Sequence, residues 1–400
     1  MNNLKELSLR LHSIAVMRDL LEDKVIKKLL DLLDLKDEAT DTEKVDTYTS
    51  FVSELYKTGT ESLADYVKQI VFESENVYVK LKGKGEVTSN ALKNSLTQDL
   101  KTFDEVAVLT PEALLSEYDF LPEYYTAKCN IANEYEKRLN NISKYGYGIY
   151  AKYRMFYIDG EGVIVPVQNP DETKLSDLYN YKREQKIIMD NTKALIEGFP
   201  AANILLTGDA GTGKSSTVKA VANELADKGL RIIEVRKEQL HKIPKILDEL
   251  TQNPLKFILF IDDLSFTKDD DNFSGLKAIL EGSVSAKSNN VVIYATSNRR
   301  HLVKENFSDR EGDDVHFNDT LQEILSLSER FGIQLTFSRP DKTTYLDIVH
   351  NLANKEGILY DTQKLDETAE KFVLKRGTRS ARAAKQFIDA IISGNITNIK

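Results

Sequence analysis

The chain has 400 residues, of which 41% are hydrophobic and 29% are charged. This composition is typical of a folded globular protein of two or three domains and excludes a wholly disordered chain. The formal net charge of −9 disfavours a protein that coats nucleic acid, and the lack of long apolar runs argues against a membrane protein. The single cysteine, Cys129, excludes a disulfide framework, so we expect a cytoplasmic protein with a packed thiol.

Residues 1–145 predict a mainly helical N-terminal domain, because apolar residues recur at helical spacing from the start of the chain. The first such set is Leu4, Leu7, Leu11 and Ile14. A glycine-containing turn at residues 82–85 interrupts a later helical run. The leucines and tyrosines of this region are most simply core residues, and no motif in it indicates a chemistry.

Residues 146–170 predict a hairpin or a linker. Two stretches, 147–157 and 162–167, flank the turn sequence I-D-G-E-G, an arrangement typical of two paired strands. The sequence N-P-D-E at residues 169–172 then indicates a domain boundary.

Residues 171–338 change to short apolar strands that alternate with helical segments. The expected strands are 203–207, 231–235, 257–261, 291–296 and 333–337, and the expected helices are 215–229, 243–250 and 275–284. Near-continuous apolar strands separated by helices indicate an α/β domain whose parallel sheet is covered on both faces. Residues 339–400 predict a small domain of three helices, the last of which starts near Ser380.

A glycine-rich loop, G-D-A-G-T-G-K-S-S, joins the first of these strands to the helix that follows. It fits the pattern G-x-x-x-x-G-K-[ST], in which glycines turn backbone N–H groups toward a phosphate and the lysine adds a positive charge. A flexible linker is the alternative, but the flanking strand and helix disfavour it. We therefore predict ATP binding by Gly208, Asp209, Ala210, Gly211, Thr212, Gly213, Lys214, Ser215 and Ser216.

Two aspartates, Asp262 and Asp263, end the apolar strand K-F-I-L-F-I. A carboxylate at the carboxyl end of a strand can hold Mg²⁺ together with the Ser215 hydroxyl, as a Walker-B aspartate does. We predict that Asp262 is this metal ligand and that its neighbour, Asp263, orients the attacking water. The alternative is an acidic strand cap without a catalytic role.

Polar residues follow at three further places in the chain. Asn298 ends the strand V-V-I-Y-A-T-S, Arg330 comes just before the last strand, and Arg379 and Arg382 flank the start of the last helix. This succession of phosphate loop, metal carboxylate, polar strand tip and arginines resembles the AAA+ ATPases. The match covers roughly residues 171–400.

The resemblance implies a P-loop NTPase fold of the AAA+ type, in which the C-terminal helices form a lid. It implies that Asn298 is sensor 1, that Arg330 is the arginine finger, and that Arg382, or alternatively Arg379, is sensor 2. It also implies that residues 175–192 pack near the adenine. Each of these side chains has a structural alternative, in which Asn298 caps a turn and the arginines pair with neighbouring carboxylates.

Longer strings narrow the resemblance to one bacterial AAA+ family, whose members are labelled only as ATP-binding proteins of unknown function. The strings are K-F-I-L-F-I-D-D-L-S-F, L-K-A-I-L-E-G-S-V, I-Y-A-T-S-N-R-R-H-L and L-S-E-R-F-G, together with the phosphate loop. Most AAA+ proteins have glutamate after the metal aspartate, whereas this chain has Asp263, whose side chain is one methylene shorter. We therefore expect slow hydrolysis, suited to a switch.

The expected function is that of a slow Mg²⁺-dependent ATPase that couples its nucleotide state to the remodelling or loading of an unknown client. The resemblance implies a homo-oligomer, and the N-terminal region is the expected place for a protein client. The alternatives are an ATP-dependent switch that does not hydrolyse, a loader ATPase that acts on nucleic acid, and a small-molecule kinase. The acidic composition disfavours the loader, and no acceptor-binding lid with clustered arginines supports the kinase.

Overall fold

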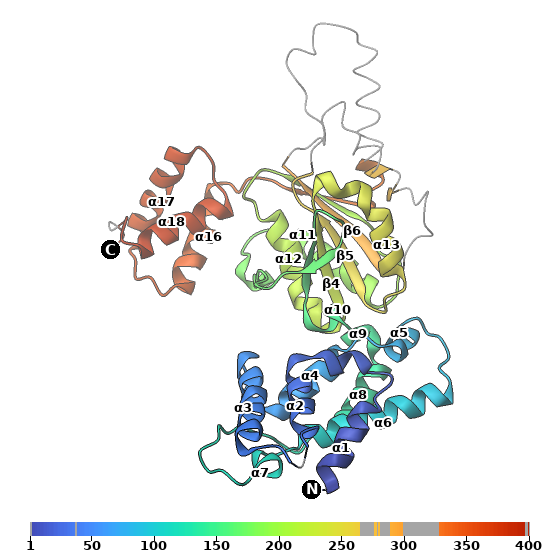
Figure 1. Ribbon diagram of the computed structural model, residues 1–400. Helices are drawn as coiled ribbons and strands as arrows, with labels where there is room; N and C mark the ends of the chain where they lie inside the picture. The colour runs from blue at the N-terminus through green and yellow to red at the C-terminus, as the bar shows by residue number, and fades with distance from the viewer. Residues whose placement is uncertain are drawn as a thin grey trace. The chain divides into compact units, whose positions relative to one another are not determined.

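The computed structural model describes residues 2–36, 38–264, 276–277, 279–280, 289–298, 328–396 and 399 of the chain (Figure 1). The chain divides into two compact units. The first consists of Met1–Lys152 and Gln252–Leu255, and the second consists of Tyr153–Thr251 and Lys256–Lys400. In the ranges just given, no helix combines the length and the apolar composition needed to cross a bilayer.

The first unit is built of helices. They are α1 (Asn2–His12), the 3₁₀ helix η1 (Arg18–Glu22), α2 (Lys24–Leu33), α3 (Asp41–Lys57), α4 (Leu63–Glu73), α5 (Val77–Gly83), α6 (Asn90–Ala107), α7 (Pro111–Leu114), α8 (Ile131–Asn140), α9 (Ile142–Tyr145) and α10 (Ile149–Lys152). Leu7, Leu11 and Ile14 are buried in one core, as their spacing predicts. Cys129 packs against the same core, and burial raises the pKa of its thiol.

A seven-stranded sheet forms the centre of the second unit. Its strands are β1 (Met155–Ile158), β2 (Ile164–Pro166), β3 (Ile204–Gly208), β4 (Leu230–Val235), β5 (Lys256–Ile261), β6 (Val291–Ser297) and β7 (Ile333–Phe337). The strand order is β2-β1-β4-β5-β6-β3-β7, and all neighbours are parallel except β1 and β2. The predicted α/β class with a parallel sheet is confirmed, and the five predicted strands start and end within one residue of the observed ones.

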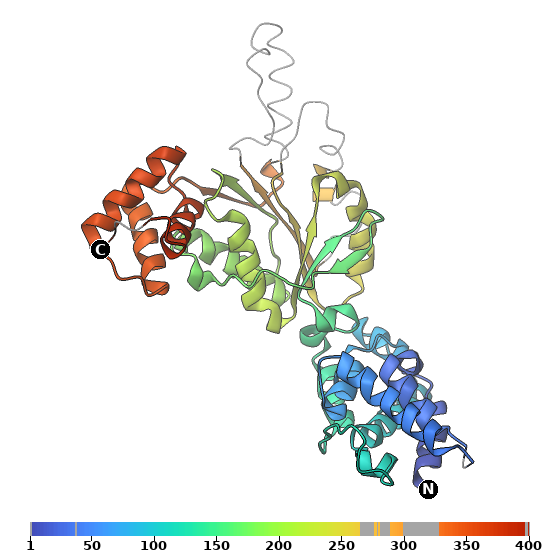
Figure 2. The same cartoon turned by 60° about the vertical axis from the view of Figure 1, so that its left-hand side comes forward.

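Helices cover both faces of this sheet (Figures 1 and 2). On one face, α11 (Lys182–Ile196) packs against α12 (Lys214–Leu225), and both share a core with the strands. On the other face lies α13 (Ile243–Thr251). Three short 3₁₀ helices, η2 (Leu175–Asp177), η3 (Ala226–Lys228) and η4 (Lys237–Lys242), complete the connections.

Buried hydrogen bonds fix α11 to the sheet. The Tyr294 hydroxyl on β6 accepts a hydrogen bond from Asn191 Nδ2 at 3.0 Å and lies 2.8 Å from Thr192 Oγ1. Burial raises the pKa of Tyr294 to about 12, so the hydroxyl stays neutral. These contacts hold α11, and therefore the segment just before it, in a fixed position on the sheet.

The hairpin differs from its prediction in two ways. Residues 149–152 form α10, so the first strand is shorter than predicted and begins only at Met155. The physical reason lies in Gly146 and Gly148, whose positive φ angles of 68° and 58° interrupt an extended chain. In addition, β1 pairs in parallel with β4, so the hairpin lengthens the main sheet and is not a separate linker. Sequence pattern alone does not reveal this second pairing of β1, because it joins segments that are distant along the chain.

Three helices follow β7 and pack around a core of their own. They are α16 (Lys342–Lys355), α17 (Thr362–Arg376) and α18 (Ala381–Ile392). Gly377, with a φ angle of 80°, ends α17, and the Ser380 side chain caps α18. The predicted helical lid is therefore present, with its last helix beginning where expected. The helix predicted at residues 275–284 lies largely outside the described residues.

Candidate nucleotide-binding site

The glycine-rich loop lies at the carboxyl end of β3, where the backbone requires glycine. Gly208 has a φ angle of 131°, and a Cβ atom here would lie 2.1 Å from the Phe337 carbonyl oxygen on β7. Gly213 has a φ angle of 94° immediately before α12, with open space where its Cβ atom would be. The neighbouring strand thus excludes a side chain at Gly208, whereas Gly213 leaves room for a ligand beside the N-terminus of α12.

Lys214 begins α12, and its ammonium group is turned into the loop. The residue is only 5% exposed. Its Nζ donates to the carbonyl oxygens of Gly208 and Asp209 at 2.8 Å each, and to Asn298 Oδ1 at 3.0 Å. Burial lowers the pKa of Lys214, while neighbouring carboxylates, Asp209 first among them, oppose this shift. The ammonium group of Lys214 therefore lies beside the N-terminus of α12, where the positive end of the helix dipole favours a bound anion.

Asp262, which follows β5, accepts hydrogen bonds from two hydroxyl groups. Ser215 Oγ donates to Asp262 Oδ1 at 2.6 Å, and the Thr296 hydroxyl on β6 donates to the same oxygen. The predicted metal ligands, Ser215 and Asp262, are thus direct neighbours. Among the residues with known placement, no cluster of three or more histidine, cysteine or acidic side chains forms a metal site. A bound Mg²⁺ would therefore depend on this pair and on ligand oxygens.

Asn298 joins Lys214 to Asp263. Its Oδ1 accepts from Lys214 Nζ, and its Nδ2 donates to Asp263 Oδ1 at 2.7 Å. Asp263 has a φ angle of 55°, which is uncommon for a residue other than glycine. Its backbone N–H donates to Thr296 Oγ1 at 3.0 Å, which helps to hold this conformation. Side chains from three parts of the chain therefore meet at one edge of the sheet.

These side chains help to line a cavity of about 730 Å³, a size that suits a nucleotide. Ala210 through Thr217 form one wall, and Thr173, Gln185 and residues 177–181 form a second. The lid supplies a third wall through Ile348, Leu352, Lys355, Arg382, Lys385 and Ile388. Gly208 and Asp209 belong to the loop but do not line the cavity.

The two candidate lid arginines have different surroundings. Arg379 donates to both carboxylate oxygens of Glu370, at 3.1 Å and 2.7 Å, and it does not line the cavity. Arg382 lines the cavity, and its backbone N–H donates to the Gly211 carbonyl oxygen at 3.2 Å. The geometry therefore favours Arg382 as the lid residue that faces a ligand, whereas Arg379 matches its structural alternative.

Arg330 lies three residues before the start of β7 and does not line the cavity. The structure therefore does not bring Arg330 together with the other predicted site residues. Its role as an arginine finger stays a prediction, and it requires a second subunit whose nucleotide Arg330 would reach.

Most of the second unit matches a family model. Residues 151–395 match the family described as "Protein of unknown function (DUF815)". The chain belongs to the DUF815 family. No curated protein matches the chain. Among solved structures, AMPPCP-bound DnaA from Aquifex aeolicus is similar at 16% sequence identity and a TM-score of 0.40, over 56% of this chain and 66% of that chain. The match thus spans slightly less than two thirds of DnaA.

Three residues that the sequence did not single out belong to the surroundings of the site in this DUF815 protein. Thr296 hydrogen-bonds both aspartates that follow β5. Arg339 Nε lies 3.0 Å from Asp209 Oδ1 of the loop. Lys355 lines the cavity and lies 2.6 Å from Asp177. A threonine in an apolar strand and isolated cations carry no motif, so only their positions in space reveal them.

The residues of this DUF815 site fit a magnesium nucleotide. A buried ammonium group faces the phosphate loop, and Gly213 leaves open space beside it. A hydroxyl and a carboxylate lie 2.6 Å apart, as two protein oxygens of a Mg²⁺ site would. Apolar lid residues line the cavity with the loop, which suits a ligand with an anionic end and a less polar end.

Proposed function

We propose that this DUF815 protein binds Mg·ATP in the cavity and hydrolyses it slowly. One observation carries the proposal: hydrogen bonds run from Lys214 through Asn298 to Asp263, beside the pair of Ser215 and Asp262. A candidate phosphate-binding cation, two candidate metal ligands and a further carboxylate thus line the same cavity. This is the set of groups that phosphoryl transfer to water needs.

Each side chain has one task in this proposal. Lys214 and the backbone N–H groups of the loop bind the phosphates. Ser215 and Asp262 hold Mg²⁺, which supplies charge neutralisation at the transferring phosphoryl group. Asp263 orients the attacking water, and Asn298 positions Asp263. Arg382 adds positive charge from the lid.

We also propose that the nucleotide state changes the angle between the sheet and the lid. The supporting contact is the hydrogen bond from the Arg382 N–H to the Gly211 carbonyl, since it joins the first turn of α18 to the phosphate loop. A ligand that moves the loop then also moves α18. The N-terminal helical unit would hold a client, and the active form would be a homo-oligomer; these two points rest on the AAA+ resemblance. The expected cytoplasmic location rests on the composition, above all on the single cysteine.

A switch that binds ATP without hydrolysis is the second candidate. The observation that favours it is the hydrogen bond between Asn298 Nδ2 and Asp263 Oδ1, because it occupies one oxygen of the carboxylate that would orient the water. The short side chain of Asp263 also limits its reach. Measurement of steady-state phosphate release separates the two candidates, and stimulation by DNA that falls steeply with salt would indicate the loader.

Substitution of Lys214 tests ATP binding. Mg·ATP at about 100 times its dissociation constant is expected to stabilise the wild-type fold by about 2.7 kcal/mol through linkage. The variant Lys214→Ala is expected to lose most of this stabilisation, because the phosphates lose their cation. Thermal unfolding midpoints with and without Mg·ATP measure the difference.

The exposed residue Lys228 on η3 provides the matched control. Lys228→Ala is expected to respond to Mg·ATP as the wild type does. A wild-type midpoint that does not move with saturating Mg·ATP would contradict ATP binding at this site.

A further inference from the structure

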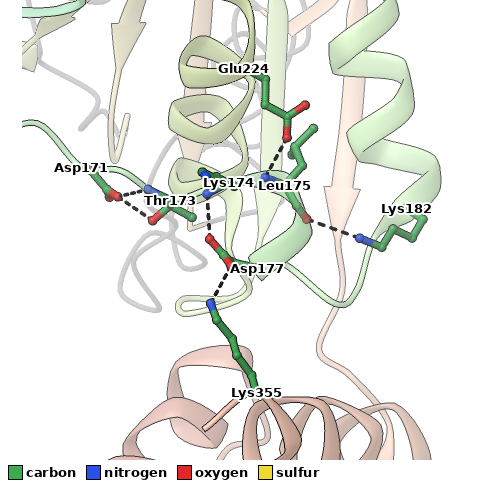
Figure 3. A network of polar contacts seen from close by, with 8 residues as sticks. All are labelled: Asp171, Thr173, Lys174, Leu175, Asp177, Lys182, Glu224 and Lys355. Carbon is green, nitrogen blue, oxygen red and sulfur yellow. Dashed lines mark hydrogen bonds and ion pairs between the residues drawn. The ribbon is translucent and has the colours of Figure 1, made fainter.

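The segment before α11 forms one wall of the cavity and is fixed to the sheet domain. We call residues 171–180 the strap. Asn223 Nδ2 on α12 donates to the carbonyl oxygens of Asp171 and Thr173, at 2.8 Å and 3.0 Å. The next residue of α12, Glu224, accepts the N–H of Leu175 at 3.1 Å (Figure 3). The strap therefore moves with α12, the helix that begins at Lys214.

Two side chains of α11 fix the end of the strap. Lys182 Nζ donates to the Leu178 carbonyl oxygen at 2.7 Å, and Gln185 Nε2 donates to the Asn180 carbonyl oxygen at 2.8 Å. Since α11 is itself bonded to β6, the strap belongs mechanically to the sheet domain.

Asp177 in the strap uses its two carboxylate oxygens for different partners. Oδ2 accepts the backbone N–H of Lys174 at 3.0 Å, which closes a turn within the strap. Oδ1 accepts from Lys355 Nζ at 2.6 Å, and Lys355 is the last residue of α16 in the lid (Figure 3). The contact with Lys355 lowers the pKa of Asp177, and the same contact raises the pKa of Lys355. Both groups are therefore charged at neutral pH.

The ion pair spans two walls of the cavity. Asp177 and Lys355 both line it, one from the strap and one from the lid. The other contact described above, between Arg382 and Gly211, joins the lid to the phosphate loop. Among the described residues, polar contacts thus join the lid segment to the glycine-rich loop, through Arg382 and Arg339, and to the strap, through Lys355. Movement of the lid away from the strap would widen the path by which a ligand leaves the cavity.

We propose that the Asp177–Lys355 ion pair is a latch that holds the lid on the strap and sets how long a nucleotide stays bound. This inference rests on the proposed nucleotide binding and adds a step that the phosphate loop does not control. The pair is partly exposed, with side-chain exposures of 48% for Lys355 and 32% for Asp177, so its effect is modest and sensitive to salt.

Nucleotide dissociation measures the latch directly. In stopped-flow experiments with a fluorescent ADP analogue on the full chain, Lys355→Ala is expected to release nucleotide about two- to fivefold faster than the wild type. Asp177→Asn is expected to act alike, and its amide oxygen can still accept the Lys174 N–H. Combining Asp177→Lys with Lys355→Asp is expected to restore slow release. Added salt is expected to accelerate release from the wild type more than from Lys355→Ala.

Lys371 provides the control within the lid. It lies on α17, 4.0 Å from Glu367 one helical turn away, and it does not line the cavity. Lys371→Ala is expected to release nucleotide at the wild-type rate. Equal rates for Lys355→Ala, Lys371→Ala and the wild type would overturn the latch.

A second measurement needs no nucleotide and so separates the latch from the proposed function. Spin labels at Lys193→Cys on α11 and Lys375→Cys on α17, with Cys129→Ser, report the distance between the sheet domain and the lid. Lys355→Ala is expected to broaden the distance distribution. A distance distribution unchanged by Lys355→Ala would overturn the latch. If the distribution broadens but the wild type fails to bind nucleotide in a separate assay, the latch is supported and the proposed function is contradicted.

Discussion

At the scale of single residues, Asn298 connects the two halves of the candidate site. Its amide oxygen faces the ammonium group of Lys214 and its amide nitrogen faces the carboxylate of Asp263. An asparagine suits this place because it offers an acceptor to the cation and a donor to the anion at the same time. A phosphate that draws Lys214 away would also alter the contact with Asp263, so binding and water orientation are linked through one side chain.

Substitution of Asp263 tests this link. Asp263→Asn is expected to keep ATP binding and to lower the rate of hydrolysis by about 100-fold or more, because a neutral amide holds and orients the attacking water less strongly than a carboxylate does. Phosphate release measures the rate, and thermal stabilisation by Mg·ATP measures binding. Asp227→Asn, at an exposed aspartate paired with Arg154, is the control and is expected to behave as the wild type. Wild-type turnover by Asp263→Asn would remove Asp263 from the mechanism.

At the scale of elements, the carboxyl end of β7 joins the sheet, the loop and the lid. Arg339 follows this strand and pairs with Asp209 of the loop at 3.0 Å. The Tyr181 hydroxyl donates to the Ser338 carbonyl oxygen, and the centroid of the Tyr181 ring lies 4.6 Å from that of the Phe337 ring. The connection into α16 is thus bonded on one side to the phosphate loop and on the other to the start of α11.

Substitution of Arg339 tests this connection. Arg339→Ala is expected to weaken ATP binding about two- to fivefold, because the carboxylate of Asp209 then lacks its compensating cation and offsets more of the positive charge of Lys214. Isothermal titration with Mg·ATP measures the dissociation constant. Arg154→Ala removes a comparably exposed arginine from an ion pair with Asp227 and is expected to leave the constant unchanged. If Arg339→Ala and Arg154→Ala have the same dissociation constant for Mg·ATP, the ion pair between Arg339 and Asp209 has no role in binding.

At the scale of the whole molecule, the described residues that line the cavity all belong to the second unit. Arg330 also belongs to this unit but lies outside the lining, so a catalytic role for it needs a neighbouring copy of the chain. An oligomer that shares its sites in this way has a turnover per subunit that depends on concentration.

We therefore expect turnover per subunit to rise with protein concentration and to reach a plateau on assembly. Arg330→Ala is expected to keep ATP binding and to lose about 10³-fold in turnover at the plateau, since an arginine supplied in trans stabilises the charge of the transition state. Phosphate release across a dilution series measures both effects. Arg183→Ala, at an exposed position of α11, serves as the control. If turnover per subunit does not depend on protein concentration and Arg330→Ala hydrolyses ATP at the wild-type rate, Arg330 does not act on the nucleotide of a neighbouring subunit.

Much of the fold could be predicted because its signals are local. The apolar runs predicted β3 to β7. In the inner strands β3, β4, β5 and β6, residues buried on both faces of the parallel sheet leave a nearly unbroken apolar pattern. Gly377 and the Ser380 cap located the last helix of the lid in the same way. The glycine-rich loop could be proposed as a phosphate site from the sequence, because phosphate binding needs fixed residue types at fixed spacing. The hairpin was predicted only in outline, since its pairing with β4 leaves no local trace.

The sequence by itself therefore determined the fold class, the phosphate loop and the candidates for the metal ligands, because each depends on neighbours along the chain. Only the tertiary structure distinguished Arg379, which pairs with Glu370, from Arg382, which lines the cavity. It alone revealed that Lys355 meets Asp177. The sequence does not show which charged residue will pair with an isolated charge. The pair forms only when folding brings distant segments within the few ångströms over which two charges interact strongly.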